Sequence, residues 1–310
     1  MLDVRRLRLL YELSRRGTIA AVGRALHLSP SGVSQQLAQL ETEAGVRLLD
    51  HVGRGVRLTE AARMLAAHAE SVLARLEQAE TELAVLGQRP TGTVRIASFQ
   101  TAALALIPEL LVLLARHRDL RIELAQVEPE QALPALLAHD HDLVLGEEYP
   151  GAPVRISPQL HRVDLCTDPI RLATPAPDPN PGTDRSTVLD RSVGCAWVME
   201  PRGTASRRWA TTLCRSAGFE PDVRYESDDL FVHLALAERG LAAAFLPDLI
   251  WRRHSPGIAL HDLHDLGGPG GPTRTIFTGV RRGSERHPAI RAVRGALRTA
   301  AVGGLPNPDR

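Results

Sequence analysis

The chain has 310 residues, of which 44% are hydrophobic and 24% charged, and its formal net charge is +1. This size and apolar content favour two or three compact units with buried cores over one small domain. Since the net charge is close to zero, the whole chain gives no sign of nucleic-acid binding, and any basic surface has to be local.

The cysteine pattern and the first residues indicate in which cellular compartment the protein acts. Cys166, Cys195 and Cys214 form no CxxC pair and lie in apolar stretches, so we expect reduced thiols and no disulfide framework. Cysteine-based redox sensing stays open as a minor alternative. Charged residues interrupt the apolar ones near the start, and no 18 apolar residues run together. We therefore expect no signal peptide, no membrane span and a cytoplasmic location.

Helical spacing of apolar residues begins at Val4 and predicts a first helix that ends near Arg16, before Gly17. Thr18 is a suitable N-cap for a second short helix over residues 19–26. Positive charge gathers in this part of the chain, because residues 1–58 hold nine arginines against five acidic residues. The following residues 59–89 hold three arginines against five glutamates.

A third helix is predicted to start at Ser29-Pro30, an N-cap followed by proline at the first helical position. Its apolar stripe is Val33, Leu37 and Leu40, which leaves an uncharged polar face of Ser31, Ser34, Gln35 and Gln39. Two β-prone segments, 45–49 and 51–58, then surround a glycine-containing turn with Arg54 at its tip. This is the pattern of a winged helix-turn-helix.

Two short helices joined by a tight turn can place serine and glutamine side chains in the major groove of DNA, and the wing places arginines beside them. The alternative is a solvated face on a generic three-helix bundle with a surface hairpin. The candidate DNA-binding residues are Thr18, Ser29, Pro30, Ser31, Ser34, Gln35, Gln36, Arg54 and Arg57.

A heptad pattern follows the wing, with spacing 4-3-4-3-4-3 over three heptads. Its members, which we predict to form a dimer interface, are Leu65, Ala69, Val72, Leu76, Ala79, Leu83 and Leu86. A helix packed within one globule usually has a wider apolar face, so residues 59–88 are predicted to be a dimerising helix. Residues 89–93, with Pro90 and Gly92, form a predicted hinge.

The order and spacing of these segments resemble the LysR-type transcription regulators. The resemblance rests on the run from Gly17 to Leu37, on Leu40-Glu41, and on residues 45–49 and 53–61, and it covers most of residues 4–90. Departures include Val22-Gly23 where two alanines are usual, Pro30 where glutamine is common, Gly32 for alanine, Leu49 for phenylalanine and His51 for arginine. If Gly23 lies within a helix, it should cost about 1 kcal/mol relative to alanine.

The resemblance implies a transcription regulator of three parts: the winged helix-turn-helix of residues 1–58, the linker helix, and an α/β effector domain over residues 94–302. This last domain would resemble a two-lobed, type 2 periplasmic binding protein, with lobe I at 94–164 and 267–302 and lobe II at 165–266. Paired linker helices would set two DNA-binding units on an interrupted palindrome, in a homodimer or tetramer. RNA polymerase is a further candidate partner.

The residue pattern after the hinge agrees with this expectation. Strands at 94–98, 121–127 and 143–146 alternate with helices that end near His117 and His139, which predicts a parallel sheet. A second α/β series begins within residues 165–174 and passes through a proline-rich loop. We place the crossings between lobes near Asp164 and within 263–271, and predict a disordered tail at 303–310.

The effector is expected between the lobes, at helix N-termini that follow strands. The first set is Ser98, Phe99, Gln100 and Thr101, and the second is Glu200, Arg202, Gly203 and Thr204. Because free backbone N–H groups and Arg202 would favour negative charge, we expect an anionic metabolite. The alternative is that Ser98 and Thr101 only cap a helix and that Arg202 pairs with Glu200.

Other chemistries lack their motifs. The sequence has no Gly-x-Ser-x-Gly elbow, no phosphate-binding loop with lysine and no HExxH, so we expect no enzyme and no cofactor. The clusters at residues 139–142 and 261–265 lack metal-ligand spacing, and no metal site is predicted. A transport-type binding protein would share the two lobes, but residues 1–90 argue against it.

Overall fold

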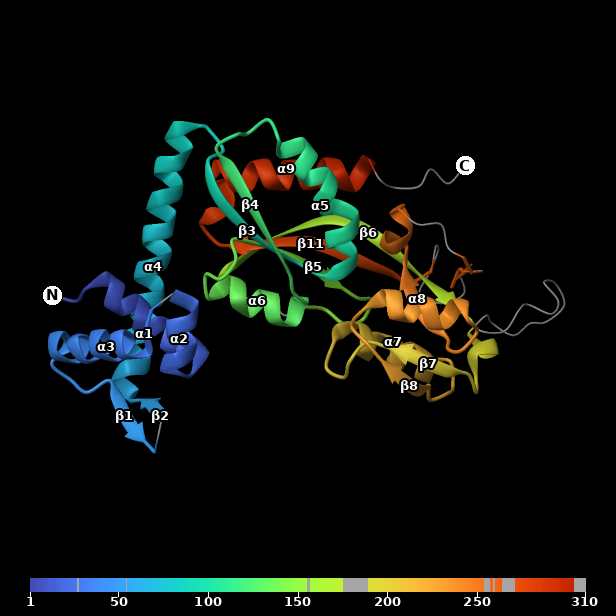
Figure 1. The fold of residues 1–310 in the computed structure, drawn as a ribbon, viewed down its shortest axis with the longest axis horizontal. Helices are drawn as coiled ribbons and strands as arrows, with labels where there is room; N and C mark the ends of the chain where they lie inside the picture. The colour runs from blue at the N-terminus through green and yellow to red at the C-terminus, as the bar shows by residue number, and fades with distance from the viewer. Residues whose placement is uncertain are drawn as a thin grey trace. The chain divides into compact units, whose positions relative to one another are not determined.

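The computed structural model describes residues 1–26, 28–53, 55–154, 157–174, 189–253, 257–258, 260–263 and 271–303. The chain divides into two compact units (Figure 1). The first comprises Met1–Arg89 with the short segments Leu137–Asp140 and Arg282–Pro288, and the second contains the rest. No helix among the described residues is long and apolar enough to cross a membrane.

The N-terminal unit is a three-helix bundle with a hairpin and a long fourth helix. Its elements are α1 (Val4–Arg16), α2 (Ile19–Leu26), α3 (Pro30–Ala44), β1 (Leu49–Val52), β2 (Gly55–Leu58) and α4 (Glu60–Gly87). Strands β1 and β2 pair antiparallel, so the predicted wing is present. The turn residue Arg54 lies outside the described residues.

Local capping sets the helix boundaries, as the sequence predicts. Gly17 ends α1 in the left-handed conformation, with φ of 76°. The Thr18 hydroxyl accepts a hydrogen bond from the backbone N–H of Ala21 at 3.2 Å, and that of Ser29 accepts one from Gly32 at 3.1 Å. Pro30 occupies the first turn of α3. The predicted N-caps are therefore confirmed.

Packing then fixes the arrangement of the bundle. Val33, Leu37 and Leu40 of α3 are buried, as predicted, in a core that includes residues of α1, α2 and α4. Glu41 attaches the wing to α3, because one oxygen of its carboxylate accepts hydrogen bonds from the backbone N–H groups of Leu48 at 2.7 Å and Leu49 at 3.0 Å. The start of β1 is thereby held at the end of α3.

The structure corrects the expected cost of Gly23. The backbone N–H of Leu28 donates to the carbonyl of Gly23 at 2.8 Å, which closes the turn between α2 and α3. A Cβ atom at Gly23 would lie 2.7 Å from the carbonyl oxygen of Leu28, closer than any van der Waals contact allows. Glycine is therefore the residue that lets the two helices approach, and the expectation that alanine would be better is wrong.

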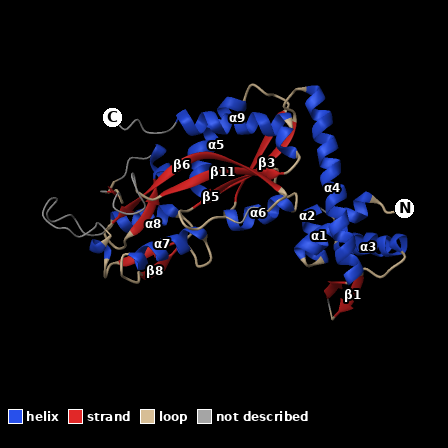
Figure 2. Ribbon diagram, turned by 180° about the vertical axis from the view of Figure 1, so that it is seen from behind, coloured by secondary structure: helices blue, strands red, loops and turns tan. Residues whose placement is uncertain are grey.

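In the second unit, one lobe is a sheet with helices on both faces. Its strand order is β4 (Leu120–Gln126), β3 (Gly92–Ser98), β5 (Leu143–Glu148), β11 (Thr273–Arg281) and β6 (Leu160–Ala173). Strands β4, β3 and β5 are parallel, and β11 is antiparallel to both of its neighbours. Figures 1 and 2 show α5 (Gln100–Leu114) and α9 (Pro288–Gly303) over one face and α6 (Pro129–Leu137) over the other.

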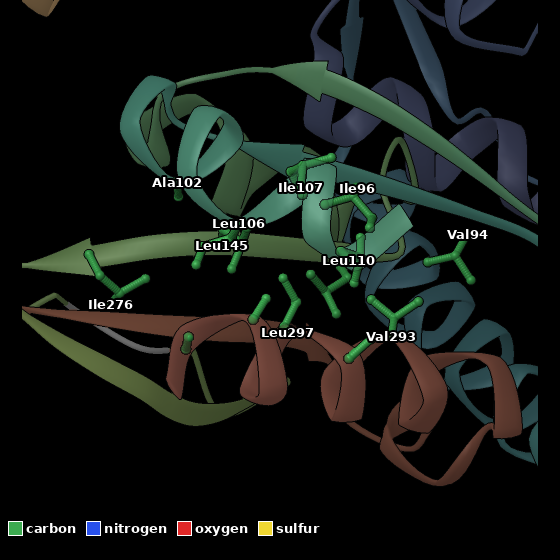
Figure 3. Packing of buried hydrophobic residues seen from close by; sticks show 14 of the residues in the cluster. Val94, Ile96, Ala102, Leu106, Ile107, Leu110, Leu145, Ile276, Val293 and Leu297 are labelled. Atoms are coloured by element: carbon green, nitrogen blue, oxygen red, sulfur yellow. The ribbon is translucent and has the colours of Figure 1, made fainter. Parts of the chain in front are cut away.

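The core of this lobe lies between the sheet and helices α5 and α9. Figure 3 shows Leu106 and Leu110 of α5 facing Val293 and Leu297 of α9, with Ile96 of β3 beside them. All five side chains are buried. This apolar layer makes the sheet a rigid support for the loops at its strand ends.

The second lobe is built from the far part of β6 and the strands that join it. Strand β6 pairs with β11 up to Pro169 and with β9 (Ala244–Pro247) from Ile170 onward. The other elements are β7 (Ala196–Met199), α7 (Ala205–Ser216), β8 (Asp222–Glu226), α8 (Leu230–Glu238) and β10 (Leu260–His261), with a short 3-10 helix at 190–192. Two further 3-10 helices lie at 248–253, after β9, and at 284–286, within the first unit.

Several helices and strands end at other residues than the sequence predicts. Strand β6 continues through Asp164, where the first crossing was expected, because it stays paired with β11 beyond this residue. Helix α5 ends at Leu114 rather than His117, and α6 ends at Leu137 rather than His139, whose φ of 60° is left-handed. The proline-rich loop, most of the second crossing and residues 304–310 lie outside the described residues. The predicted domain boundaries stay predictions.

Two glycine substitutions should have opposite effects on stability. Gly23→Ala should lower the free energy of unfolding, because its Cβ would displace the Leu28 carbonyl. Gly295→Ala should raise it by about 1 kcal/mol, because Gly295 lies within α9 and, outside the helix backbone, no atom lies within 4 Å of the place that a Cβ would take. Urea unfolding of both variants provides the measurement. A Gly23→Ala protein as stable as the parent would contradict the steric argument.

Candidate DNA interface and effector site

The exposed face of α3 carries the predicted base-reading side chains. Ser31, Ser34, Gln35 and Gln39 are all exposed, on the side opposite the buried stripe. The Ser34 hydroxyl donates to the Pro30 carbonyl at 3.0 Å and keeps both lone pairs as acceptors. This face is polar, uncharged and rigidly placed by the packing of α3, as a major-groove reader requires.

Gln36 differs from its neighbours on α3. Its side-chain oxygen accepts a hydrogen bond from Nε of Arg6 at 2.9 Å, and Arg6 also pairs with Glu43. Gln36 therefore links α3 to α1, and its amide nitrogen remains the group that could reach DNA.

The other candidates lie on the same unit. Thr18, Ser29 and Pro30 are exposed at the starts of α2 and α3. Arg57 on β2 has a side chain 72% exposed, with Asp50 of β1 at 3.6 Å. An ion pair this open contributes little, so the guanidinium is available to a phosphate.

The first predicted effector loop is occupied by protein contacts. Ser98, Phe99 and Thr101 are buried, and the Ser98 hydroxyl donates to the Phe99 carbonyl at 3.1 Å. Gln100 reaches the other lobe: its amide nitrogen donates to Asp229 at 2.7 Å, and its oxygen accepts from the backbone N–H of Leu230 at 2.8 Å. Gln100 thus joins the two lobes, whereas Ser98, Phe99 and Thr101 are buried within the chain, and an effector at this loop stays a prediction.

A buried guanidinium, absent from the sequence-based candidates, lies at the centre of this region. Arg274 on β11 is 1% exposed and stands directly opposite Asp168 of β6 in the sheet register. It donates to Asp168 at 2.9 and 2.7 Å, to the hydroxyl of Thr101 at 2.7 Å, and to Glu147 of β5. The ring of Phe99 packs 5.2 Å from the guanidinium carbon.

More carboxyl groups than cations lie around Arg274. Burial opposes the charge of Arg274, but Glu147 and Asp168 raise its pKa well above the usual value. Burial, together with the neighbouring charge of Glu147, raises the pKa of Glu128 to about 7 and that of Glu200 to about 8. A raised carboxyl pKa means that the negative form lacks a counter-charge.

The second predicted loop begins with Glu200, which is buried, and leaves Arg202 and Gly203 exposed. Thr204 is the N-cap of α7, because its hydroxyl accepts from the backbone N–H of Arg207 at 3.2 Å. A further N–H in the first turn of the helix, that of Ala205, already donates to the carboxylate of Glu130 at 2.8 Å.

These contacts argue against the expected anionic effector, which stays a prediction. The carboxylate of Glu130, which belongs to the chain, occupies the N-terminus of α7, where the anion was to bind. Arg274, the one fully buried cation among the described residues, is already shared by Asp168 and Glu147. An added anion would therefore meet carboxyl groups that lack a counter-charge.

The thiols and the polar clusters give no support to redox or metal chemistry. Burial raises the pKa of Cys166 and Cys195, and that of Cys214 to about 12, so none is poised as a thiolate. Within the described part of the chain, no three His, Cys, Asp or Glu side chains lie together as a metal site would require. Residues 264 and 265 of the second cluster lie outside it.

Two of the residues that the sequence analysis missed carry a signal, a charge beside apolar strand residues. Arg274 precedes Ile276-Phe277 of β11 and Glu147 follows Leu145-Gly146 of β5, whereas Asp168 lies among other charged residues of β6 and has no such signal. Such positions mark buried charges, but their pairing depends on sheet register, which spacing along the chain does not encode.

Comparison with known proteins assigns both units to one family. Residues 87–302 match the family described as LysR substrate binding domain, and residues 4–63 match the family described as bacterial regulatory helix-turn-helix protein, lysR family. The chain is 25% identical over 256 residues to the transcriptional dual regulator GltC of Bacillus subtilis, covering 82% of this chain and 84% of GltC.

Solved structures share the fold. A full-length OxyR variant from Pseudomonas aeruginosa has a TM-score of 0.69 at 18% identity, with 99% of each chain covered. Full-length CbnR in complex with its target DNA has a TM-score of 0.52 at 21% identity, covering 96% of this chain and 100% of CbnR.

The raised pKa of Glu200 predicts a dependence of stability on pH. Because the folded protein holds this proton more tightly than the unfolded chain, the stability that it contributes is complete below pH about 4.5 and is lost as pH rises through about 8. Glu200→Gln should remove this loss, so its stability relative to the parent should increase with pH by at most about 1.4 kcal/mol per unit. Urea unfolding at several pH values between 5 and 8 measures the difference. Glu123→Gln, at an exposed position on β4, is the control and should follow the parent.

Proposed function

Because the chain belongs to the LysR family of transcriptional regulators, with a DNA-binding unit and an effector-binding domain, we propose that α3 reads an interrupted palindrome under the control of a small molecule bound between the two lobes. The observation that carries the DNA proposal is the exposed, uncharged polar face of α3 beside the arginine-bearing wing. The structure of CbnR in complex with its target DNA supports the proposal that this chain, which has the same fold, also binds DNA.

A dimer would supply the two-fold symmetry that a palindrome requires. The apolar seam of α4 supports this in part: Val72, Leu76, Leu83 and Leu86 are exposed, the last two at 68% and 79%. Ala69 is fully buried in its own unit, and Leu65 packs against the same core. A residue without exposed surface has no area to give a second chain, so the interface would begin at Val72 and include Ala79.

The same proposal covers partners and chemistry. The protein would act in the cytoplasm, where its DNA lies, as a homodimer or tetramer that contacts RNA polymerase, and it would have no catalytic step and no cofactor. The relatives are transcriptional regulators, which favours this over enzymatic activity. The raised pKa of each thiol, caused by burial, argues against the redox alternative.

Base reading by α3 predicts a loss of selectivity in one double variant. Ser34→Ala with Gln35→Ala should lower the preference for the selected operator over random DNA at least tenfold, because base-edge hydrogen bonds contribute about 1–3 kcal/mol each. Selection from genomic fragments identifies the operator, and gel-shift titration of the variant measures the preference. Thr42→Ala, at an exposed position near the end of the same helix and outside the candidate base-reading residues, is the control. An unchanged operator preference would refute the recognition-helix assignment.

The exposed seam of α4 predicts that Leu76→Glu yields monomers, because a charge would be buried between paired helices. Sedimentation velocity at micromolar concentration measures the species present. Met64→Glu places the same charge at an equally apolar, exposed position of α4 outside the heptad and should leave the assembly intact. If Leu76→Glu remains a dimer, the interface lies elsewhere.

A further inference from the structure

A small cavity beside Glu200 has the lining of a cation site. Its volume is about 20 Å³, and its walls include Tyr149, Met199, Glu200, Ser206, Trp209 and Phe245. A space of this size holds roughly one water molecule, and an ammonium group is of similar size. It is too small for a whole metabolite, so it suits one terminal group of a larger ligand.

Aromatic and aliphatic side chains form most of the walls, together with one carboxyl group. The ring centroids of Tyr149 and Trp209 are 5.5 Å apart, and those of Trp209 and Phe245 are 5.1 Å apart. Glu200 is buried beside them. Ring faces attract cations, and a desolvated carboxylate forms charge-assisted hydrogen bonds with an ammonium group. A metal ion such as Mg²⁺ would require several oxygen ligands, which a mostly apolar lining does not offer.

Among the residues that the structure describes, those around Glu200 leave its negative charge without a partner cation. Arg274 already forms ion pairs with Asp168 and Glu147. Arg207 of α7 donates to the backbone carbonyl of Glu200 at 3.0 Å and pairs with Glu226 at 3.4 Å. The remaining neighbours are acidic or neutral: Glu128 and Glu147 repel the charge, Ser206 and Tyr149 are hydroxyl groups, and burial lowers the pKa of His233 on α8.

We propose that the effector carries an ammonium group, which enters this cavity and pairs with Glu200 beside the rings of Tyr149 and Trp209. This inference rests on the proposed function, since it names the chemical class of the molecule that controls the regulator. The bound ammonium group supplies the cation that the buried carboxyl groups lack. Through Tyr149, whose hydroxyl lies 3.4 Å from Arg274, it also reaches the network between the lobes.

Binding of this kind depends on pH in a defined direction. Glu200 must lose its proton to pair with an ammonium group, and burial raises its pKa to about 8. Alkylammonium groups stay charged well above that pH. Affinity for the ammonium ligand should therefore be roughly twentyfold lower at pH 6.5 than at pH 8.5. An anionic ligand would show the opposite trend, because protonated carboxyl groups would repel it less.

The experiment compares three probes of equal chain length on the full chain: n-butylammonium chloride, sodium butyrate and 1-butanol, at matched ionic strength. Tryptophan fluorescence and thermal unfolding report binding, since Trp209 lines the cavity. We expect butylammonium alone to change both signals, saturably and more strongly at pH 8.5 than at 6.5. Stabilisation by butyrate, or equal effects of all three, overturns the proposal.

Variants locate the response. Glu200→Gln should abolish the butylammonium response and its pH dependence, whereas Glu226→Gln, which removes an exposed carboxylate of the same lobe, should preserve both. A response that survives Glu200→Gln overturns the site. Operator binding is measured on the same samples. Selective DNA binding without any ammonium response rejects this inference alone, whereas absence of selective DNA binding by the parent protein counts against the proposed function.

Discussion

The buried pair of Arg274 and Asp168 fixes the arrangement on which the effector domain depends. A buried ion is costly unless its charge and its hydrogen bonds are matched, and Arg274 has no access to water that would replace a lost partner. Its contacts extend from β11 to β6, to Glu147 on β5 and to Thr101 at the start of α5. Four elements must therefore be in place together, close to the point where β6 passes from one lobe to the other.

This network also decides what the surrounding groups can bind. Because Arg274 is shared by Asp168 and Glu147, the carboxyl groups of Glu128 and Glu200 have no cation of their own within the described part of the chain, and burial raises their pKa values. The N-terminus of α7, which would otherwise attract an anion, carries Glu130. The groups that would attract an anionic ligand, Arg274 and the N-terminus of α7, are thus already occupied by carboxylates of the chain itself.

The sequence predicts best what is decided locally. Gly17, Thr18 and the Ser29-Pro30 pair set helix ends through contacts within a few residues, and the structure confirms each of them. Pairing across the fold could not be predicted, since Asp168 and Arg274 are 106 residues apart. Periodicity in α4 predicts an apolar stripe, but it does not distinguish a stripe packed within the chain, as at Ala69, from one left exposed, as at Leu83. The requirement for glycine at position 23 could not be predicted either, because it comes from the close approach of the Leu28 carbonyl, which only the folded turn brings about.

Strand β6 is a single element of 14 residues that belongs to both lobes, bonded to β11 on one stretch and to β9 on the next. At this crossing the lobes share a continuous pleated ribbon, which bends poorly within its plane but twists readily about its own axis. A ligand that draws the lobes together would therefore act here as a torque. The conformational change transmitted along β6 would be a rotation of one lobe's sheet relative to the other's. Its angle would be limited by how much β6 can twist while it keeps its backbone hydrogen bonds to β11 and β9.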